Sequence, residues 1–185
     1  MSTPGSAPSS LRRRISTRRQ IIGGVICLLC FYIYYLFGSG RWMTFQIEGS
    51  SMEPTLLAGE RVLVDRRLRA PVARGDLVVF HDPRPRYHED LLIKRVSALP
   101  GDQIEVRGGR LYVNGLLEVV PGVVDPVVPD TGDTARTLGD NEVFLLGDNR
   151  ATSFDSTEFG PLSTDALLGR VTIRIWPLGR LGRVP

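Results

Sequence analysis

The chain of 185 residues carries a net charge of +3, and its 42% hydrophobic and 23% charged residues are typical of a globular protein rather than a disordered one. Five arginines among the first 19 residues account for more than the whole net positive charge, so the remainder offers no basic surface of the kind that binds nucleic acid. The length suits one ordinary domain and an anchor.

The N-terminal part divides into a polar tail and an apolar run. Residues 1–20 are rich in Ser, Pro and Arg and are expected to be a disordered cytoplasmic tail. Residues 21–40 are predicted to be a transmembrane helix, because Ile21–Phe37 is uncharged and about 20 residues span a bilayer. The preceding arginines place residues 41–185 outside the cell membrane by the positive-inside rule. A cleaved signal peptide is the alternative, since residues 17–22 faintly resemble a twin-arginine signal.

Both cysteines, Cys27 and Cys30, lie within the apolar run. Their spacing suggests a redox pair, but one helical turn within lipid favours two small apolar residues. Because residues 41–185 contain no cysteine, no disulfide can stabilise that part of the chain.

Residues 41–185 are predicted to be mainly β structure, because short apolar or alternating segments follow turn-forming glycines. Residues 103–115 alternate about Gly108-Gly109, which is a hairpin signal. Ser163–Leu168 is predicted as a short helix capped by Ser163, and residues 119–137 as an irregular excursion. The other predicted strands are residues 61–65, 76–80, 91–96, 142–146 and 171–176.

Two residues suggest nucleophilic catalysis. Ser51 lies at a proline-containing bend shortly after the apolar run, and Lys94 is the only lysine in the chain. Arginine keeps its proton in proteins whereas a buried lysine can lose it, so Lys94 is a candidate general base for Ser51. Singly, each residue has an ordinary alternative: Ser51 as a helix cap, and Lys94 as a strand lysine reaching to water.

A third stretch, Gly147–Ser156, concentrates turn formers, an arginine and hydroxyls, and by itself reads as a polar turn. In this order the stretches resemble the bacterial type I signal peptidases, membrane-bound Ser/Lys proteases that remove signal peptides from exported proteins. The matching motifs are Ser51-Met52-x-Pro54-Thr55-Leu56, Gly75-Asp76-x-Val78-Val79-Phe80, Lys94-Arg95-x-x-x-x-Pro100-Gly101-Asp102 and Gly147-Asp148-Asn149-Arg150-x-x-Ser153-x-Asp155-Ser156.

The resemblance implies a β-sheet or barrel catalytic domain behind a single N-terminal transmembrane helix. It implies Ser51 as nucleophile and Lys94 as general base, with a pKa well below the usual value of about 10.4. Ser153 matches a hydroxyl that hydrogen-bonds the lysine amine. Asp155 matches a structural carboxylate, expected to pair with Arg95 or Arg150. The family's arginine two residues after this aspartate is replaced by threonine.

The resemblance also implies which groups stabilise the oxyanion and which substrates are bound. The backbone N–H of Ser51 is the first expected oxyanion donor, while Gly49 stands where many members carry a second, serine donor. The substrates implied are secretory preproteins with Ala-x-Ala-type signal peptides, bound as an extended strand after delivery by the translocase. The expected apolar pocket residues, for which ordinary core packing is the alternative, are Phe45, Ile47, Met52, Leu56 and Ile93.

The sequence is also compatible with functions other than that of a signal peptidase. His81 or His88 could serve a Ser-His-Asp hydrolase, although both lie in a Pro/Arg-rich segment typical of surface loops. A self-cleaving regulator would share Ser/Lys chemistry, and a tethered peptide-binding β domain would need none. The resemblance implies no metal and no cofactor.

Overall fold

The computed structural model describes residues 9–38, 40–68, 71–87, 89–123 and 134–184. The chain forms two units, residues 1–41 and residues 42–185.

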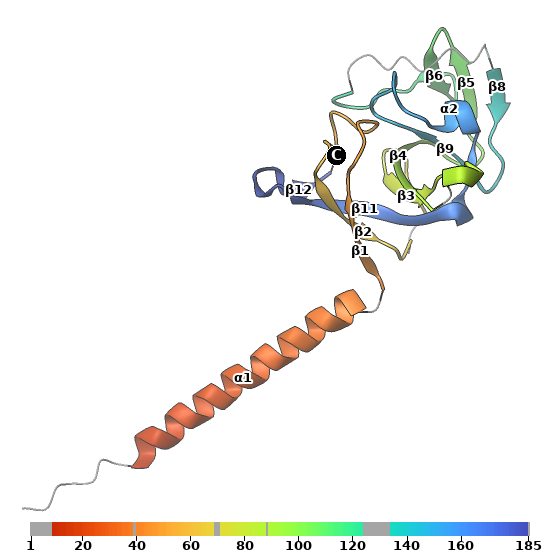
Figure 1. Ribbon diagram of the computed structural model, residues 1–185. Coiled ribbons are helices and arrows are strands. Elements are labelled where there is room, and N and C mark those ends of the chain that lie inside the picture. Colours follow the sequence, from red (N-terminus) through yellow and green to blue (C-terminus); the bar gives the residue numbers. More distant parts are fainter. Residues whose placement is uncertain (1–8, 39, 69–70, 88, 124–133, 185) are drawn as a thin grey trace, which may run out of the picture. The chain divides into compact units, whose positions relative to one another are not determined.

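The first unit contains one helix, α1 (Ser9–Gly38) (Figure 1). The helix begins well before the predicted span, so residues 9–20 are helical and not the disordered tail that we expected. Leucine and arginine favour helix, and neither Gly nor Pro occurs between Ser9 and Gln20. Residues 1–8 and Ser39 lie outside the described chain.

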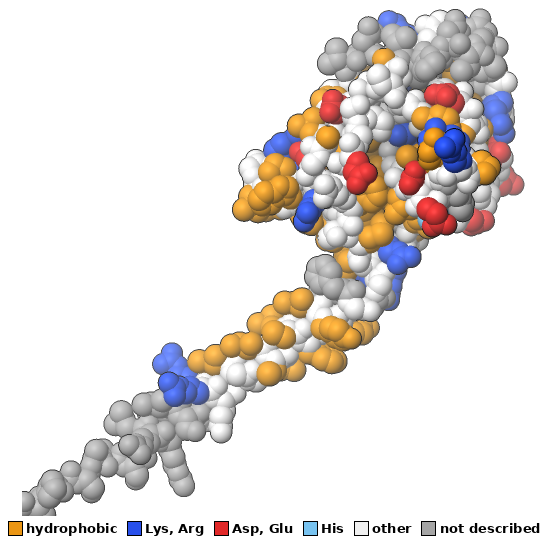
Figure 2. All heavy atoms as spheres, in the orientation of Figure 1, with side chains coloured by type: hydrophobic (Ala, Val, Ile, Leu, Met, Phe, Trp, Pro, Cys, Tyr) orange, Lys and Arg blue, Asp and Glu red, His pale blue; other side chains and the backbone are white. Residues whose placement is uncertain are grey.

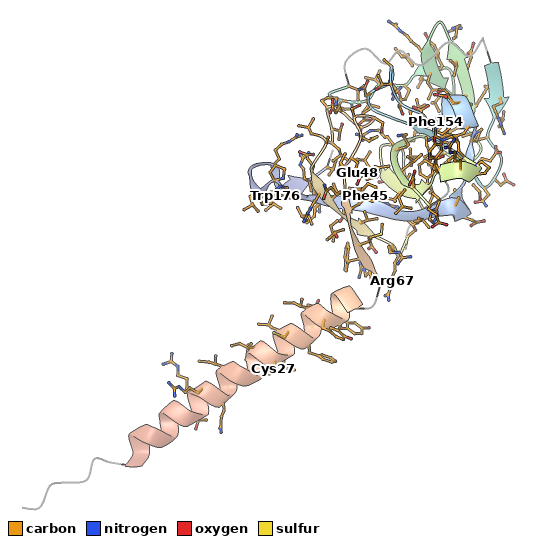
Figure 3. All side chains as sticks on the ribbon, viewed as in Figure 1. Cys27, Phe45, Glu48, Arg67, Phe154 and Trp176 are labelled. Carbon is orange, nitrogen blue, oxygen red and sulfur yellow. The ribbon has the colours of Figure 1, made fainter. Side chains whose placement is uncertain are left out.

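The apolar side chains of α1 between Ile21 and Tyr35 are exposed, as Figure 2 shows. Cys27, labelled in Figure 3, and Cys30 are exposed free thiols on the same helix. Within the described residues, no helix is both long enough and apolar enough to cross a membrane.

The second unit is built on two antiparallel sheets, which confirms the prediction of a mainly β protein (Figure 1). The large sheet has the order β1 (Trp42–Gln46), β2 (Arg61–Asp65), β11 (Leu167–Trp176), β3 (Leu77–His81), β4 (Leu91–Ala98), β9 (Glu142–Leu146) and β10 (Leu162–Ser163), with β12 (Gly182–Arg183) paired to β11. The small sheet has the order β7 (Leu116–Leu117), β6 (Arg110–Val113), β5 (Gln103–Arg107) and β8 (Thr134–Thr137). The short helical segments are α2 (Ser156–Phe159), η1 (Pro85–Tyr87), η2 (Thr164–Ala166) and η3 (Leu178–Arg180).

The predicted strands of the sheets are confirmed, with ends displaced by a few residues. The hairpin of β5 and β6 turns at Gly108 and Gly109, whose φ angles of 55° and 70° are the positive values that a two-residue hairpin loop requires. The predicted helix Ser163–Leu168 is wrong. Ser163 caps only the single turn η2, and β11 begins directly after it at Leu167.

Part of the predicted excursion, residues 119–137, is also ordered as a strand. Residues 134–137 form β8, which pairs with β5, while residues 124–133 lie outside the described chain. Short edge strands such as β8 carry little periodicity of their own and depend on their partner for definition.

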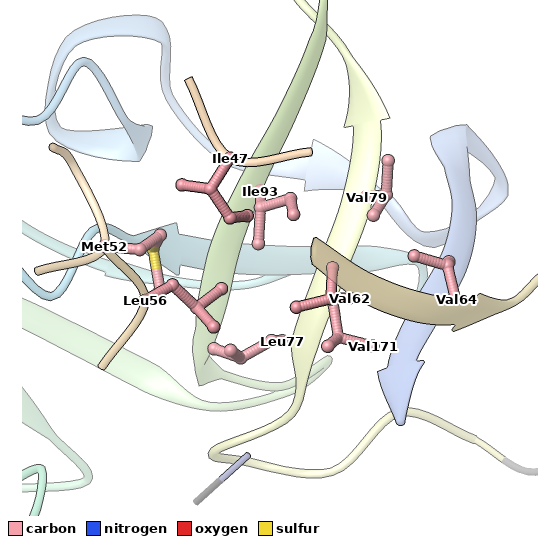
Figure 4. Close-up of a cluster of buried hydrophobic side chains, with 9 residues drawn as sticks. All are labelled: Ile47, Met52, Leu56, Val62, Val64, Leu77, Val79, Ile93 and Val171. Atoms are coloured by element: carbon pink, nitrogen blue, oxygen red, sulfur yellow. The ribbon is translucent and has the colours of Figure 1, made fainter. Parts of the chain in front are cut away.

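Strands β1 and β4 of the large sheet lie on either side of one apolar cluster. Four antiparallel pairings separate β1 from β4 along the sheet, so these two strands run in the same direction. Between them lies an apolar cluster, drawn in Figure 4, that stabilises this end of the sheet by burying its side chains. The buried members are Ile47, Met52, Leu56, Val62, Val64, Leu77, Val79, Ile93 and Val171.

Candidate active site

Ser51 lies in a tight turn that follows β1. The turn is closed by backbone hydrogen bonds from Glu53 N to Ser50 O at 3.0 Å and from Leu56 N to Met52 O at 2.8 Å. Met52 and Leu56 enter the apolar cluster, so the turn is anchored on one side by burial. The Ser51 side chain remains half-buried and accessible from the cleft described below.

Lys94 reaches Ser51 from the middle of β4. Its backbone pairs with Val78 of β3, and its side chain is almost completely buried, at 2% exposure. Lys94 Nζ donates a hydrogen bond to Ser51 Oγ at 2.8 Å. The two residues are therefore in direct contact although 43 positions separate them in the sequence.

Burial lowers the pKa of Lys94 from 10.5 to about 8, because desolvation disfavours the ammonium form. The carboxylates of Asp155, Asp82 and Asp148 oppose this shift by stabilising the positive charge. A pKa near 8 leaves part of the amine neutral close to neutral pH, so Lys94 can accept a proton there.

The Gly147–Arg150 stretch docks on the backbone of the serine turn. Asn149 N donates to Ser51 O at 3.0 Å, and Asn149 Nδ2 donates to Ser50 O at 3.3 Å. Gly147 lies so close that a Cβ atom added to it would come within 2.6 Å of Ser51 O. The stretch thus fixes the position of the serine backbone.

Two buried ion pairs hold this stretch. Arg95, which follows Lys94 on β4, donates from Nε and Nη2 to the two carboxylate oxygens of Asp148 at 2.8 and 2.6 Å. Arg150 Nη2 donates to Glu118 at 2.8 Å, and Glu118 also accepts from Ser97 Oγ at 2.8 Å. A bidentate, hydrogen-bonded arginine is well suited to hold a buried carboxylate.

Asp155 has partners other than the arginine that we expected. Its carboxylate accepts from Gly147 N at 3.0 Å, and it caps α2 by accepting from Thr157 N at 3.1 Å and Thr157 Oγ1 at 2.8 Å. The expected pairs with Arg95 and Arg150 are replaced by Arg95–Asp148 and Arg150–Glu118. Thr157 thus supplies hydrogen bonds to Asp155 in place of the ion pair that we expected.

Ser153 is buried beside Gly147, but the structure gives its hydroxyl no hydrogen-bond partner among the described residues. The expected hydrogen bond from Ser153 to the Lys94 amine is therefore not formed here. The Lys94 amine donates instead to Ser51 Oγ.

A cleft of about 550 Å³ opens at Ser51 and Lys94, the pair called the dyad from here on. It lies between the end of β1 and the first half of β4. Figure 3 labels Phe45 and Glu48 on the β1 side of it. The lining includes the dyad together with Phe45, Ile47, Gly49, Met52 and Ile93. Leu56, also predicted for a substrate pocket, does not line the cleft. It is fully buried in the apolar cluster, because the serine turn folds it inwards.

Both strands that wall the cleft have free edges. Among the described residues, β1 pairs only with β2, and β4 pairs with β9 only from Arg95 onwards. Leu91–Lys94 therefore pairs with β3 alone and leaves its other edge to the cleft. An edge of this kind can accept an extended peptide by strand addition.

The two histidines were the alternative candidates for a general base. His81 ends β3 and is not part of the lining, and His88 lies outside the described residues. Across the described part of the chain, no group of three or more His, Cys, Asp and Glu side chains could hold a metal ion.

Sequence analysis missed Glu118 and did not assign Asp148 as the partner of Arg95. Both are acidic residues next to buried arginines, and a buried arginine requires a carboxylate. The tertiary fold decides which carboxylate pairs with which arginine. The sequence therefore shows only that the charged residues are present.

A serine hydroxyl against a buried lysine amine, at the end of a cleft with free strand edges, is the arrangement expected of a Ser/Lys hydrolase. Comparison with known proteins narrows this class. A family model described as "Signal peptidase, peptidase S26" matches residues 18–176. The chain belongs to this signal peptidase family, and it is therefore a serine endopeptidase of the kind that removes signal peptides.

Several relatives are similar over most of the chain. Signal peptidase I U of Bacillus subtilis is 33% identical over 180 residues, which cover 92% of each protein. Signal peptidase IB of Staphylococcus aureus is 30% identical over 181 residues, 86% of this chain and 92% of that protein. The protein named "Probable signal peptidase I-2" of Synechocystis is 37% identical over 142 residues, 74% of this chain and 64% of that protein. A crystal structure of a signal peptidase I from Enterococcus faecalis covers 56% of this chain and 98% of that chain, at 29% identity and a TM-score of 0.45.

Proposed function

We propose that this chain is a membrane-bound endopeptidase that cuts signal peptides from exported preproteins with Ser51 as nucleophile and Lys94 as general base. The observation that carries the proposal is the 2.8 Å contact between Lys94 Nζ and Ser51 Oγ, made by a lysine that burial has made easy to deprotonate. The 2.8 Å separation suits proton transfer between these two atoms.

The neutral amine of Lys94 accepts the Ser51 proton while Oγ attacks the carbonyl of the residue before the cleaved bond. The tetrahedral oxyanion is stabilised by the backbone N–H of Ser51. When the C–N bond breaks, Lys94 returns the proton to the leaving amine, which is the new N-terminus of the mature protein. Lys94 then deprotonates a water molecule that hydrolyses the Ser51 ester, and the freed serine regains its proton.

The substrate lies as an extended strand between the free edges of β1 and β4. The side chains at the cleft floor, Ile47, Met52 and Ile93, are 2–5% exposed and thus leave only shallow room. Shallow apolar pockets favour small side chains, which matches signal peptides that end in Ala-x-Ala. Such preproteins reach the enzyme from the translocase.

The first test is cleavage of a purified preprotein with an Ala-x-Ala site, followed by N-terminal sequencing of the product. We expect one cut directly after the second alanine, and we expect replacement of that alanine by leucine to slow cleavage about 100-fold, because the larger side chain does not fit a shallow pocket. Equal cleavage of both preproteins, or a cut elsewhere, contradicts the proposal. A preprotein with leucine at the middle position serves as the control, since that side chain is expected to point away from the floor.

We also propose that the N-terminal helix attaches the enzyme to the cell membrane, with residues 42–185 outside. The support is sequence: residues 21–38 carry no charge, and five arginines precede them. We expect the full chain to stay with membranes after alkaline extraction and a chain lacking residues 1–41 to be released. Release of the full chain would contradict membrane attachment and leave the proposed chemistry untouched.

A further inference from the structure

Thr55, four residues after Ser51, is a meeting point of arginine side chains. Arg174 Nη1 donates to the Thr55 carbonyl oxygen at 2.9 Å, and Arg180 Nη2 makes a longer contact of 3.4 Å with the same oxygen. Arg95 Nη2 contacts Thr55 Oγ1 at 3.3 Å. The serine turn is therefore held at its far end by side chains that come from β11 and from the C-terminal turn η3.

Glu60 organises two of these arginines. Its Oε2 accepts from Arg174 Nη1 at 3.0 Å and from Leu57 N at 3.1 Å. Its Oε1 lies 2.8 Å from Arg180 Nη1, an ion pair whose geometry is not that of a directed hydrogen bond. The Glu60 side chain is only 4% exposed, so it gives two cations a buried counter-charge next to the turn.

The same glutamate reaches the cleft wall through its backbone. Ile47 N donates to Glu60 O at 2.9 Å, and Gly59 N donates to Ile47 O at 2.8 Å. Ile47 lines the cleft beside the dyad. Glu60 thus ties the cleft wall and the serine turn together, although it lines no part of the cleft itself.

The C-terminal turn completes the arrangement. The carbonyl oxygen of Arg180 accepts from Arg174 Nε at 2.8 Å and so orients the guanidinium that holds Thr55. Trp176, labelled in Figure 3 where β11 ends, is exposed and leads the chain into this turn. Arg180 therefore acts on the serine turn twice, through its carbonyl and through its side chain.

We propose that Glu60 and Arg180, acting through Arg174, are positioning residues for Ser51, so that the C-terminal turn of the chain sets the rate of the chemical step. This inference rests on the proposed role of Ser51 as nucleophile. A nucleophile displaced by about 1 Å can lose about 100-fold in rate, so small shifts of the turn are sufficient. The Arg180 side chain contacts Thr55 and Glu60 and not the cleft edges of β1 and β4, so its loss is expected to lower kcat and to leave KM unchanged.

The test compares Arg180→Ala with Arg183→Ala in the full-length enzyme. Arg183 is an exposed arginine on β12, close in sequence and with no ion pair among the described residues, which makes it a matched control. We expect Arg180→Ala to lower kcat about tenfold with KM within about twofold of wild type, and Arg183→Ala to leave both unchanged. Since Arg180 is 36% exposed, its removal should leave the fold intact.

The pH profile separates positioning from general loosening. If Arg180 only positions the turn, the pH at which kcat is half-maximal stays near 8 in Arg180→Ala. A loosened fold would hydrate Lys94 and move this midpoint upward towards its ordinary pKa. Such a shift, or equal kcat values for the two arginine variants, overturns the inference.

Glu60→Gln supplies a second variant. Because Glu60 and Arg180 act on the same turn, we expect the double variant to lose much less than the product of the two single losses. Independent, multiplicative losses would contradict the inference, and if Glu60→Gln does not fold the comparison of the arginine variants decides alone. Retained activity in Ser51→Ala would instead overturn the proposed function, which these variants leave untouched.

Discussion

Lys94→Arg is expected to abolish cleavage while the protein stays folded. Arginine keeps the positive charge that Asp155, Asp82 and Asp148 favour at this position, but it does not give up its proton. Loss of a general base lowers kcat/KM by about 10³-fold or more. The measurement is kcat/KM on the preprotein, with thermal melting followed by circular dichroism to establish folding.

Ser51→Ala should be inactive to the same degree, and the double variant no worse than either single one, because the two residues act as a unit. A Lys94→Arg enzyme that keeps a tenth of wild-type activity would show that the base lies elsewhere. Arg183→Ala again serves as the control, because it removes an exposed basic side chain outside the candidate active site.

The same lysine sets the pH dependence of the reaction. Its pKa of about 8 means that the reactive, neutral amine increases as pH rises through 8, so kcat should rise over this range and fall tenfold for each pH unit well below it. The stability of the fold is expected to change with pH in the same direction as kcat. Between about pH 8 and 10.5 the unfolded chain keeps a proton that the folded chain has lost, so the free energy of unfolding rises with pH there. Lys94→Met should remove that part of the rise.

The pairing of Ser51 with Lys94 could be predicted because the chemical character of each residue is visible in the sequence. A lone lysine among arginines, in an apolar strand segment, indicates a task that requires deprotonation, and the serine motif precedes it in a recognisable order. The structure brings these two side chains into contact across 43 positions. The strands around them follow from alternation and from glycines at positive φ, as at Gly108-Gly109.

The supporting residues were harder to predict because charges do not encode their partners. Arg95 and Arg150 were recognised, but their carboxylates are Asp148 and Glu118, and Asp155 instead binds backbone N–H groups. Apolar residues present the same difficulty. Met52 and Leu56 both enter the apolar cluster from one turn, yet only Met52 also lines the cleft. A local bend decides which side chain faces the substrate, and hydrophobicity does not reveal that bend.

Gly147→Ala is expected to have the second large effect, because this glycine is wedged between the two halves of the site. An added Cβ would lie 2.6 Å from Ser51 O and closer still to the Ser153 side chain. Neither neighbour can yield easily, since Ser51 O is held by Asn149 N and Ser153 is buried. The methyl group must displace Ser153, the Ser51 backbone or both, and we expect the serine turn to move relative to Lys94. We expect kcat to fall about 100-fold and the protein to lose about 1–3 kcal/mol of stability from overpacking.

Gly139→Ala is the matched control, because the nearest atoms to its Cβ would be those of the Glu142 side chain, at an ordinary 3.6 Å. Activity and melting temperature should stay near wild type in this variant. The informative comparison is between the two losses in Gly147→Ala. A stability loss with full activity would mean that the turn relaxes without moving Ser51, which contradicts the wedge. A 100-fold activity loss at nearly unchanged stability would mean that the strain is relieved by displacing Ser51 from Lys94. In the proposed mechanism, activity depends on the 2.8 Å contact between Lys94 Nζ and Ser51 Oγ, and Gly147→Ala tests that dependence.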